Sequence, residues 1–134
     1  MLRAMERPTP MPQNADTRPL VLIVDDDLAV RESLAMVMEA FGFRAQTAMN
    51  GAEGLKAVAA EAPSAVITDL QMPEMTGLEL IATLRRTATG IPVIAMSGGD
   101  VEAARHMGAA AAFHKPLPVF EMIEAVQGLT RRAA

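Results

Sequence analysis

Short apolar runs that alternate with helical patterns constrain the fold of this chain most. The clearest run, Leu20–Val24, is apolar at every position, which favours a strand buried on both faces of a parallel sheet. Further strand candidates follow it, separated by apolar residues at helical spacing. The predicted strands are Leu20–Val24, Arg44–Ala48, Ala65–Thr68, Pro92–Met96 and Ala110–Phe113. This alternation predicts an α/β domain with a doubly wound parallel sheet and right-handed crossovers.

Local signals mark where helices begin. Thr76 followed by Glu79 has the spacing of a capping box, in which each side chain accepts from the other residue's backbone N–H. Asn50 and Glu53 have the spacing of a weaker version. The stretch from 100 to 107 predicts only a short fourth helix. These signals agree with the apolar pattern.

Composition limits the class of protein. The chain has 134 residues, 51% of them hydrophobic, which suits one domain with a buried core. It has no Cys, which excludes disulfides, thiol catalysis and Cys-ligated metal sites. Its net charge is −4 and it lacks Trp and Tyr, so we expect no nucleic-acid partner. No apolar run approaches the roughly 20 residues of a membrane helix, so we expect no membrane contact and a cytoplasmic location.

The beginning of the chain differs from the rest. Residues 1–18 contain Pro8, Pro10 and Pro12 and show no apolar period. We therefore predict a flexible, proline-rich N-terminal tail over residues 1–18. A single folded domain is predicted over residues 19–131.

Polar side chains stand where four of the predicted strands end. Asp25 and Asp26 follow the first strand, Asp69 the third, Ser97 the fourth and Lys115 the fifth. In an open α/β sheet, ligands bind outside the carboxyl ends of the strands. We therefore expect these side chains to converge on one site.

Such a set of side chains suits phosphoryl transfer assisted by a divalent cation. Carboxylates held close together repel one another, and a cation relieves the repulsion. Only oxygen ligands are on offer, which favours Mg²⁺ over zinc or copper. A carboxylate can attack phosphorus to give an aspartyl phosphate, while a hydroxyl and an ammonium meet the phosphoryl oxygens.

Four short motifs carry more information than the strand ends alone. They are Val24–Asp27, the string Asp-Leu-Gln-Met-Pro-Glu-Met-Thr-Gly at 69–77, Ser97–Gly99 and Lys115–Pro116. Together they resemble the receiver domain of bacterial two-component response regulators, over residues 19–131. The resemblance implies a flavodoxin-like, five-stranded parallel sheet of order 2-1-3-4-5. It also implies a cis Lys115–Pro116 peptide bond.

The resemblance further implies a function. Asp69 would accept a phosphoryl group from the phosphohistidine of a sensor histidine kinase or a histidine phosphotransfer protein, in a Mg²⁺-dependent reaction. Ser97 and Lys115 would contact the phosphoryl oxygens. The Mg²⁺ ligands would be Asp25, Asp26, Asp69 and the backbone carbonyl of Gln71. The chain would then be a module of a two-component system or phosphorelay that switches protein–protein interactions, and not an enzyme beyond its own phosphoryl transfer and dephosphorylation.

The sequence departs from the family pattern in three places. The family's switch aromatic stands three residues before the lysine, where this chain has Ala112, with Phe113 one place later. This argues against an aromatic-flip mechanism. The stretch from Ser97 to Lys115 is shorter than usual by about one helical turn, which predicts a short or irregular fourth helix. Gly98 stands where a small Ala is common and makes that loop adaptable.

Other interpretations fit part of the pattern. Asp25 and Asp27 imitate the nucleophile motif of haloacid-dehalogenase-like phosphatases, and a phosphorylation-independent adaptor would keep the fold without the chemistry. Asp27 is itself expected to cap the following helix, and His114 to face solvent. Because little chain follows Arg132, we expect output through a downstream protein target or onward phosphate transfer. A piece of a longer regulator would carry the same residues.

Overall fold

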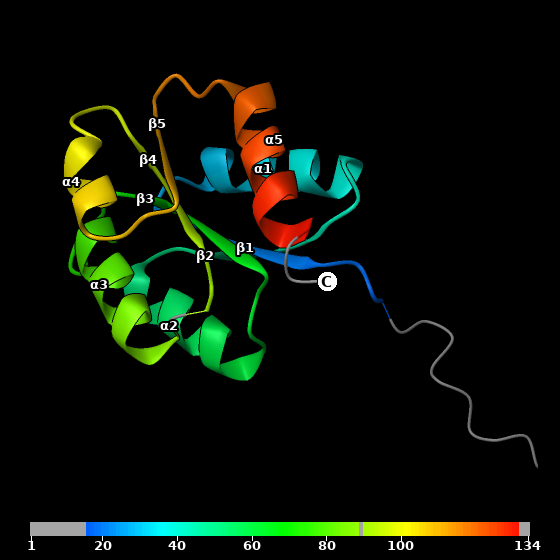
Figure 1. Cartoon of the computed structure of the whole chain (residues 1–134), viewed down its shortest axis with the longest axis horizontal. Coiled ribbons are helices and arrows are strands. Elements are labelled where there is room, and N and C mark those ends of the chain that lie inside the picture. Colours follow the sequence, from blue (N-terminus) through cyan, green and yellow to red (C-terminus); the bar gives the residue numbers. More distant parts are fainter. Residues whose placement is uncertain (1–15, 89, 132–134) are drawn as a thin grey trace, which may run out of the picture.

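The computed structural model describes residues 16–88 and 90–131, so most of the predicted N-terminal tail lies outside the described residues. Strands and helices alternate along the chain (Figure 1). The strands are β1 (Leu20–Val24), β2 (Arg44–Ala48), β3 (Ala65–Asp69), β4 (Val93–Ser97) and β5 (Ala111–His114). The helices are α1 (Leu28–Ala40), α2 (Gly51–Ala60), α3 (Gly77–Thr87), α4 (Glu102–His106) and α5 (Val119–Arg131). Each predicted strand is found within one residue of its expected bounds.

The strands form one parallel sheet. Their order is β2-β1-β3-β4-β5, which confirms the flavodoxin-like, doubly wound α/β fold. β1, β3 and β4 are buried at every position, as expected for central strands that are covered on both faces. β2 and β5 lie at the two edges and have partly exposed residues.

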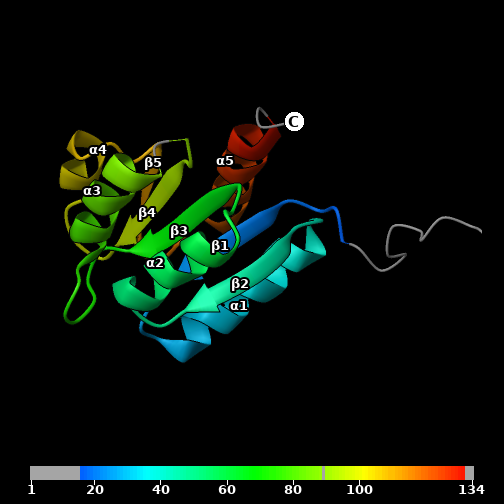
Figure 2. The same ribbon diagram turned by 90° about the horizontal axis from the view of Figure 1, so that it is seen from below.

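Helices cover both faces of the sheet (Figures 1 and 2). α1 and α5 pack on one face, against strand residues that include Val21 and Ile23. α2, α3 and α4 pack on the other face, against Leu22 and Val24. Successive residues of β1 thus serve opposite layers, as the two-residue repeat of a strand requires. Each large side chain buried in this way contributes roughly 1.5–3 kcal/mol to stability.

The capping hydrogen bonds of α3 and α2 can be compared with the capping boxes predicted from the sequence. Thr76 and Glu79 each accept a hydrogen bond from the other's backbone N–H, so the predicted capping box of α3 is complete. Asn50 accepts from the N–H of Glu53, but the Glu53 carboxylate accepts from Met49 instead of Asn50. The second box is therefore only half formed, as its weaker signal indicated. The complete box fixes the start of α3 directly after the loop that follows β3.

The C-terminal third carries the predicted irregularities. α4 spans only 5 residues, which confirms the short fourth helix. The Lys115–Pro116 peptide bond is cis, as expected. Ala112 is buried, and Phe113 packs in the layer of α1 and α5.

Within 16–88 and 90–131, no helix combines the length and apolarity needed to cross a bilayer.

Candidate functional site

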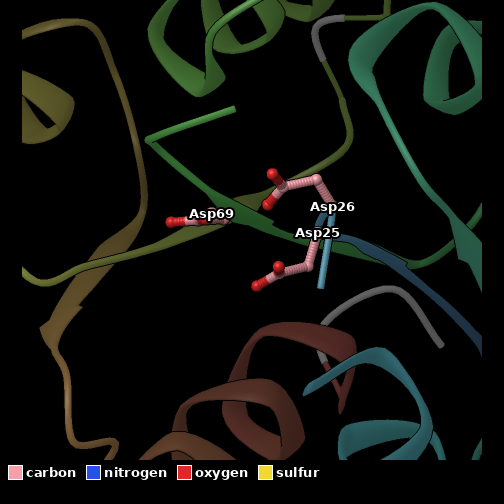
Figure 3. Close-up of side chains that lie close together, drawn as sticks. All are labelled: Asp25, Asp26 and Asp69. Atoms are coloured by element: carbon pink, nitrogen blue, oxygen red, sulfur yellow. The ribbon is translucent and has the colours of Figure 1, made fainter. Parts of the chain in front are cut away.

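The ends of β1 and β3 bring three carboxylates together. Asp25 and Asp26 follow β1, and Asp69 is the last residue of β3. One oxygen atom from each side chain lies within 4.8 Å of the others (Figure 3). The two strands pair in parallel, with Val24 opposite Thr68, so both end at the same edge of the sheet. The acids predicted to converge therefore do lie side by side.

Lys115 reaches these carboxylates from the segment after β5. Its ammonium nitrogen lies 3.6 Å from Oδ2 of Asp25 and 3.6 Å from Oδ1 of Asp69. These distances suit ion pairs but are long for hydrogen bonds. The Lys115 side chain is 32% exposed while the carboxylates of Asp25 and Asp69 are buried. Asp26, the third acid of the cluster, is exposed, so the site is open to solvent on that side.

Ser97 ends β4 beside the strand that carries Asp69. Met96 stands opposite Asp69 in the pairing of β3 with β4, and the N–H of Lys115 donates to the Ser97 carbonyl oxygen at 2.8 Å. The Ser97 hydroxyl oxygen accepts from the N–H of Gly99 at 3.0 Å. This contact uses the hydroxyl as an acceptor, so its hydrogen can still be donated to an anion. The structure thus brings Ser97 to the same edge as the acids.

Asp25 carries a charge that the protein buries. Its Oδ1 accepts from the N–H of Asp27 at 2.8 Å, but its buried Oδ2 has no hydrogen-bond partner among the described residues. Burial raises the pKa of Asp25 above its ordinary value, and the charge of Asp69 adds to the rise. The N–H of Asp27 and the ammonium of Lys115 oppose this rise in pKa. A buried carboxylate oxygen without a donor is costly unless a cation meets it.

The residues present fit a divalent metal ion. The cluster offers only carboxylate oxygens, which suit a hard cation such as Mg²⁺. Oδ2 of Asp25 has the ion pair with Lys115 at 3.6 Å but no hydrogen-bond donor among the described residues, and such an ion would complete its contacts. Gln71 lies beside the cluster, since its N–H donates to Oδ1 of Asp69 at 3.3 Å. The role of its carbonyl as a ligand stays a prediction.

Asp25→Asn is expected to stabilise the metal-free protein at neutral pH. Because the pKa of Asp25 is raised, the native state holds a proton more tightly than the unfolded chain, and stability falls as pH rises above the carboxyl's ordinary value of 3.8. A neutral amide removes this cost. We expect a melting temperature a few degrees above wild type, measured by circular dichroism in chelator. The difference in melting temperature between the variant and wild type should shrink towards about pH 4. An Asp25→Asn protein that melts below wild type at neutral pH would contradict a raised pKa for Asp25.

Two other residues behave as the sequence indicated, and one was missed. Oδ1 of Asp27 accepts from the N–H groups of Ala29 and Val30 and so caps α1, while His114 is exposed. The residue missed is Arg31, whose guanidinium donates to the backbone carbonyl oxygen of Asp25 at 2.8 Å. Its only signal is an arginine about one helical turn after the acids, a pattern also typical of a solvated helix surface.

Comparisons with known proteins agree with this geometry. The family model described as "Response regulator receiver domain" matches residues 21–127. The response regulator MprA of Mycolicibacterium vanbaalenii is 34% identical over 116 residues, which are 84% of this chain and 50% of that protein. The chain therefore spans about half the length of the curated relatives that it matches.

Solved structures extend the likeness to three dimensions. The receiver domain of the Francisella response regulator 1452 has a TM-score of 0.81 at 27% identity, covering 87% of this chain and 100% of that one. The response regulator protein TrrA of Thermotoga maritima, in complex with Mg(2+)-BeF, has a TM-score of 0.76 at 27% identity. That match covers 83% of this chain and 98% of the other.

Proposed function

The chain belongs to the family of response regulator receiver domains, and from that premise we propose that it is a phosphoacceptor signalling module whose acceptor is Asp69. One observation carries the proposal: the Lys115 ammonium lies 3.6 Å from both Asp25 and Asp69. A cation held between two buried acids can meet a new anion on either of them. We place the receiver domain at residues 19–131.

The phosphodonor is the phosphohistidine of a sensor histidine kinase or a histidine phosphotransfer protein. A carboxylate oxygen of Asp69 attacks the phosphorus atom, the new O–P bond forms and the P–N bond breaks. The imidazole nitrogen leaves with the electron pair and takes up a proton. The product is an acyl phosphate on Asp69.

The neighbours of Asp69 stabilise the charge that moves with the phosphoryl group. When bound, Mg²⁺ supplies positive charge to the phosphoryl oxygens. Asp25, Asp26, Asp69 and the backbone carbonyl of Gln71 would hold the ion. The ammonium of Lys115 and the hydroxyl of Ser97 each contact a phosphoryl oxygen, through charge-assisted hydrogen bonds.

The acyl phosphate then acts as a switch. Ser97 and Lys115 gain contacts that exist only when Asp69 is phosphorylated, so phosphorylation shifts the balance between two conformations. Because Ala112 holds the place of the family's switch aromatic, the change passes from Ser97 to the surface without a ring flip at that position. The recipient is a downstream protein target. Independence from nucleic acid and the cytoplasmic location stay predictions.

An apolar groove beside Lys115 supports docking of the donor protein. The groove has a volume of about 390 Å³ and lies between α1 and the segment that leads into α5. Its lining includes Val30, Val37, Leu117 and Lys115 itself. A helix of the donor with an apolar face could fill it. Lys115 lines the groove and lies 3.6 Å from Asp69, so a donor helix in the groove would lie beside the acceptor.

The test is a gain of mass that depends on Mg²⁺. With acetyl phosphate as a small donor and Mg²⁺ present, the intact protein is expected to gain one phosphoryl group, ~80 Da. Excess chelator is expected to abolish the gain, because the uncompensated carboxylates repel an incoming phosphoryl anion. Hydroxylamine, which cleaves acyl phosphates, should reverse it. A gain that survives chelator, or none with metal present, would count against the proposal.

A further inference from the structure

Arg31 on α1 makes a contact that the proposed chemistry does not use. Its Nη1 donates to the backbone carbonyl oxygen of Asp25 at 2.8 Å, and the contact is partly buried. Asp25 is the first residue beyond the ladders that β1 forms with β2 and β3, both of which end at Val24. The guanidinium therefore ties the start of α1 to the base of the loop that carries Asp25 and Asp26.

The peptide group that Arg31 holds is the one that joins two of the clustered acids. The Asp25 carbonyl belongs to the Asp25–Asp26 peptide bond, so its orientation constrains the backbone from which both side chains extend. Other bonds hold the flanks of the loop: the N–H of Asp25 donates to the Ala48 carbonyl at 3.1 Å, and Oδ1 of Asp25 accepts from the N–H of Asp27 at 2.8 Å. The bond from Arg31 acts on the peptide between them.

We propose that Arg31 is a positioning residue for the divalent-cation site. By bonding the Asp25 carbonyl, it holds the carboxylates of Asp25 and Asp26 in the arrangement that binds Mg²⁺. The inference rests on the proposed function, because it takes these acids as Mg²⁺ ligands. Groups that orient metal ligands in this way typically contribute about 10–100-fold to metal affinity.

The charge of Arg31 and its hydrogen bond have opposite effects on Mg²⁺ affinity. A cation near the site repels Mg²⁺, so removal of the charge alone would tighten binding. Loss of the hydrogen bond would instead free the peptide between the ligands and weaken binding. The sign of the change in Mg²⁺ affinity therefore separates the two effects.

Calorimetric titration of Mg²⁺ into the full, metal-free chain measures that sign. Arg31→Ala is expected to raise the Kd for Mg²⁺ by about 10-fold or more. Arg31→Lys keeps the charge and one donor, so its Kd should lie between those of Arg31→Ala and wild type. The matched control is Arg105→Ala, which removes another helical arginine bonded to a backbone carbonyl, that of Ala112 at 3.2 Å. The control is expected to bind Mg²⁺ as wild type does.

The Kd and the melting temperature of the Arg31 variants together separate a positioning role from a purely structural one. A purely structural role would lower the melting temperature of Arg31→Ala but leave its Kd unchanged, and that result overturns the inference, as does tighter binding. If Arg31→Ala does not fold, Arg31→Lys carries the test: weaker binding supports the inference, and unchanged or tighter binding overturns it. A wild-type chain that binds no Mg²⁺ would instead overturn the proposed function, and with it this premise.

Discussion

Asp69→Asn is expected to abolish the uptake of a phosphoryl group from acetyl phosphate. The amide has nearly the shape of the carboxylate but lacks the anionic oxygen that attacks phosphorus. Because the substitution also removes one of three clustered negative charges, we expect the fold to persist, so the loss is chemical. Intact mass after incubation with Mg²⁺ should rise by ~80 Da in wild type and stay unchanged in the variant.

Asp27→Asn is the matched control for this experiment. It removes a carboxylate close to Asp25 in the chain, but an amide oxygen can still cap α1 by accepting from the N–H groups of Ala29 and Val30. The control is therefore expected to gain the phosphoryl group as wild type does. An Asp69→Asn chain that still gains mass would rule out Asp69 as the sole acceptor.

The same variants distinguish the rival functions. A haloacid-dehalogenase-like phosphatase would turn over small phosphomonoesters, and its activity would be lost in Asp25→Asn but kept in Asp69→Asn. A phosphorylation-independent adaptor would bind its partner equally well with and without acetyl phosphate. The proposed function excludes both patterns. It assigns the phosphoryl acceptor to Asp69 at the end of β3, and it makes partner binding depend on the acyl phosphate.

Most of the fold was predictable because its central strands are uniformly apolar. β1, β3 and β4 have water on neither face, so every position must be buried and the runs stand out in the sequence. β2 gave a weaker signal, and its place at the sheet edge explains this: Gln46 and Thr47 are exposed and carry no apolar pattern. Strand order came from the family resemblance, because apolar spacing does not specify which strands pair.

The details of the site were less predictable than its membership. Strand ends indicated which acids would gather, because parallel strands finish at one edge. They did not indicate that Oδ2 of Asp25 would be the oxygen left without a donor, since that depends on how the loop to α1 turns. The bond from Arg31 depends on the same turn and on one rotamer of a long side chain. Neither leaves a periodic trace in the sequence.

Gly77→Ala is expected to destabilise the protein by about 3 kcal/mol, the largest effect on stability that we predict. Gly77 begins α3 and lies against the backbone at the end of β3. A Cβ atom there would collide with the carbonyl oxygen of Asp69 and lie 2.6 Å from Cα of Leu70. The N–H of Gly77 also donates to the Leu70 carbonyl oxygen at 3.1 Å, which fixes the close approach. Urea denaturation followed by circular dichroism measures the change.

Gly128→Ala provides the control, because a Cβ atom at Gly128 in α5 meets no neighbour within 4 Å. There the same substitution should stabilise the protein by about 0.5–1 kcal/mol, through better helix propensity. Equal unfolding midpoints for Gly77→Ala and wild type would mean that the loop after β3 yields without cost. The atom that blocks a side chain at Gly77 is the backbone carbonyl oxygen of Asp69, so relief of the collision shifts either the start of α3 or the backbone that carries the acceptor. We therefore expect the folded fraction of Gly77→Ala to take up phosphoryl groups more slowly than wild type. Gly77 would then affect the chemistry at Asp69 as well as the stability of the fold.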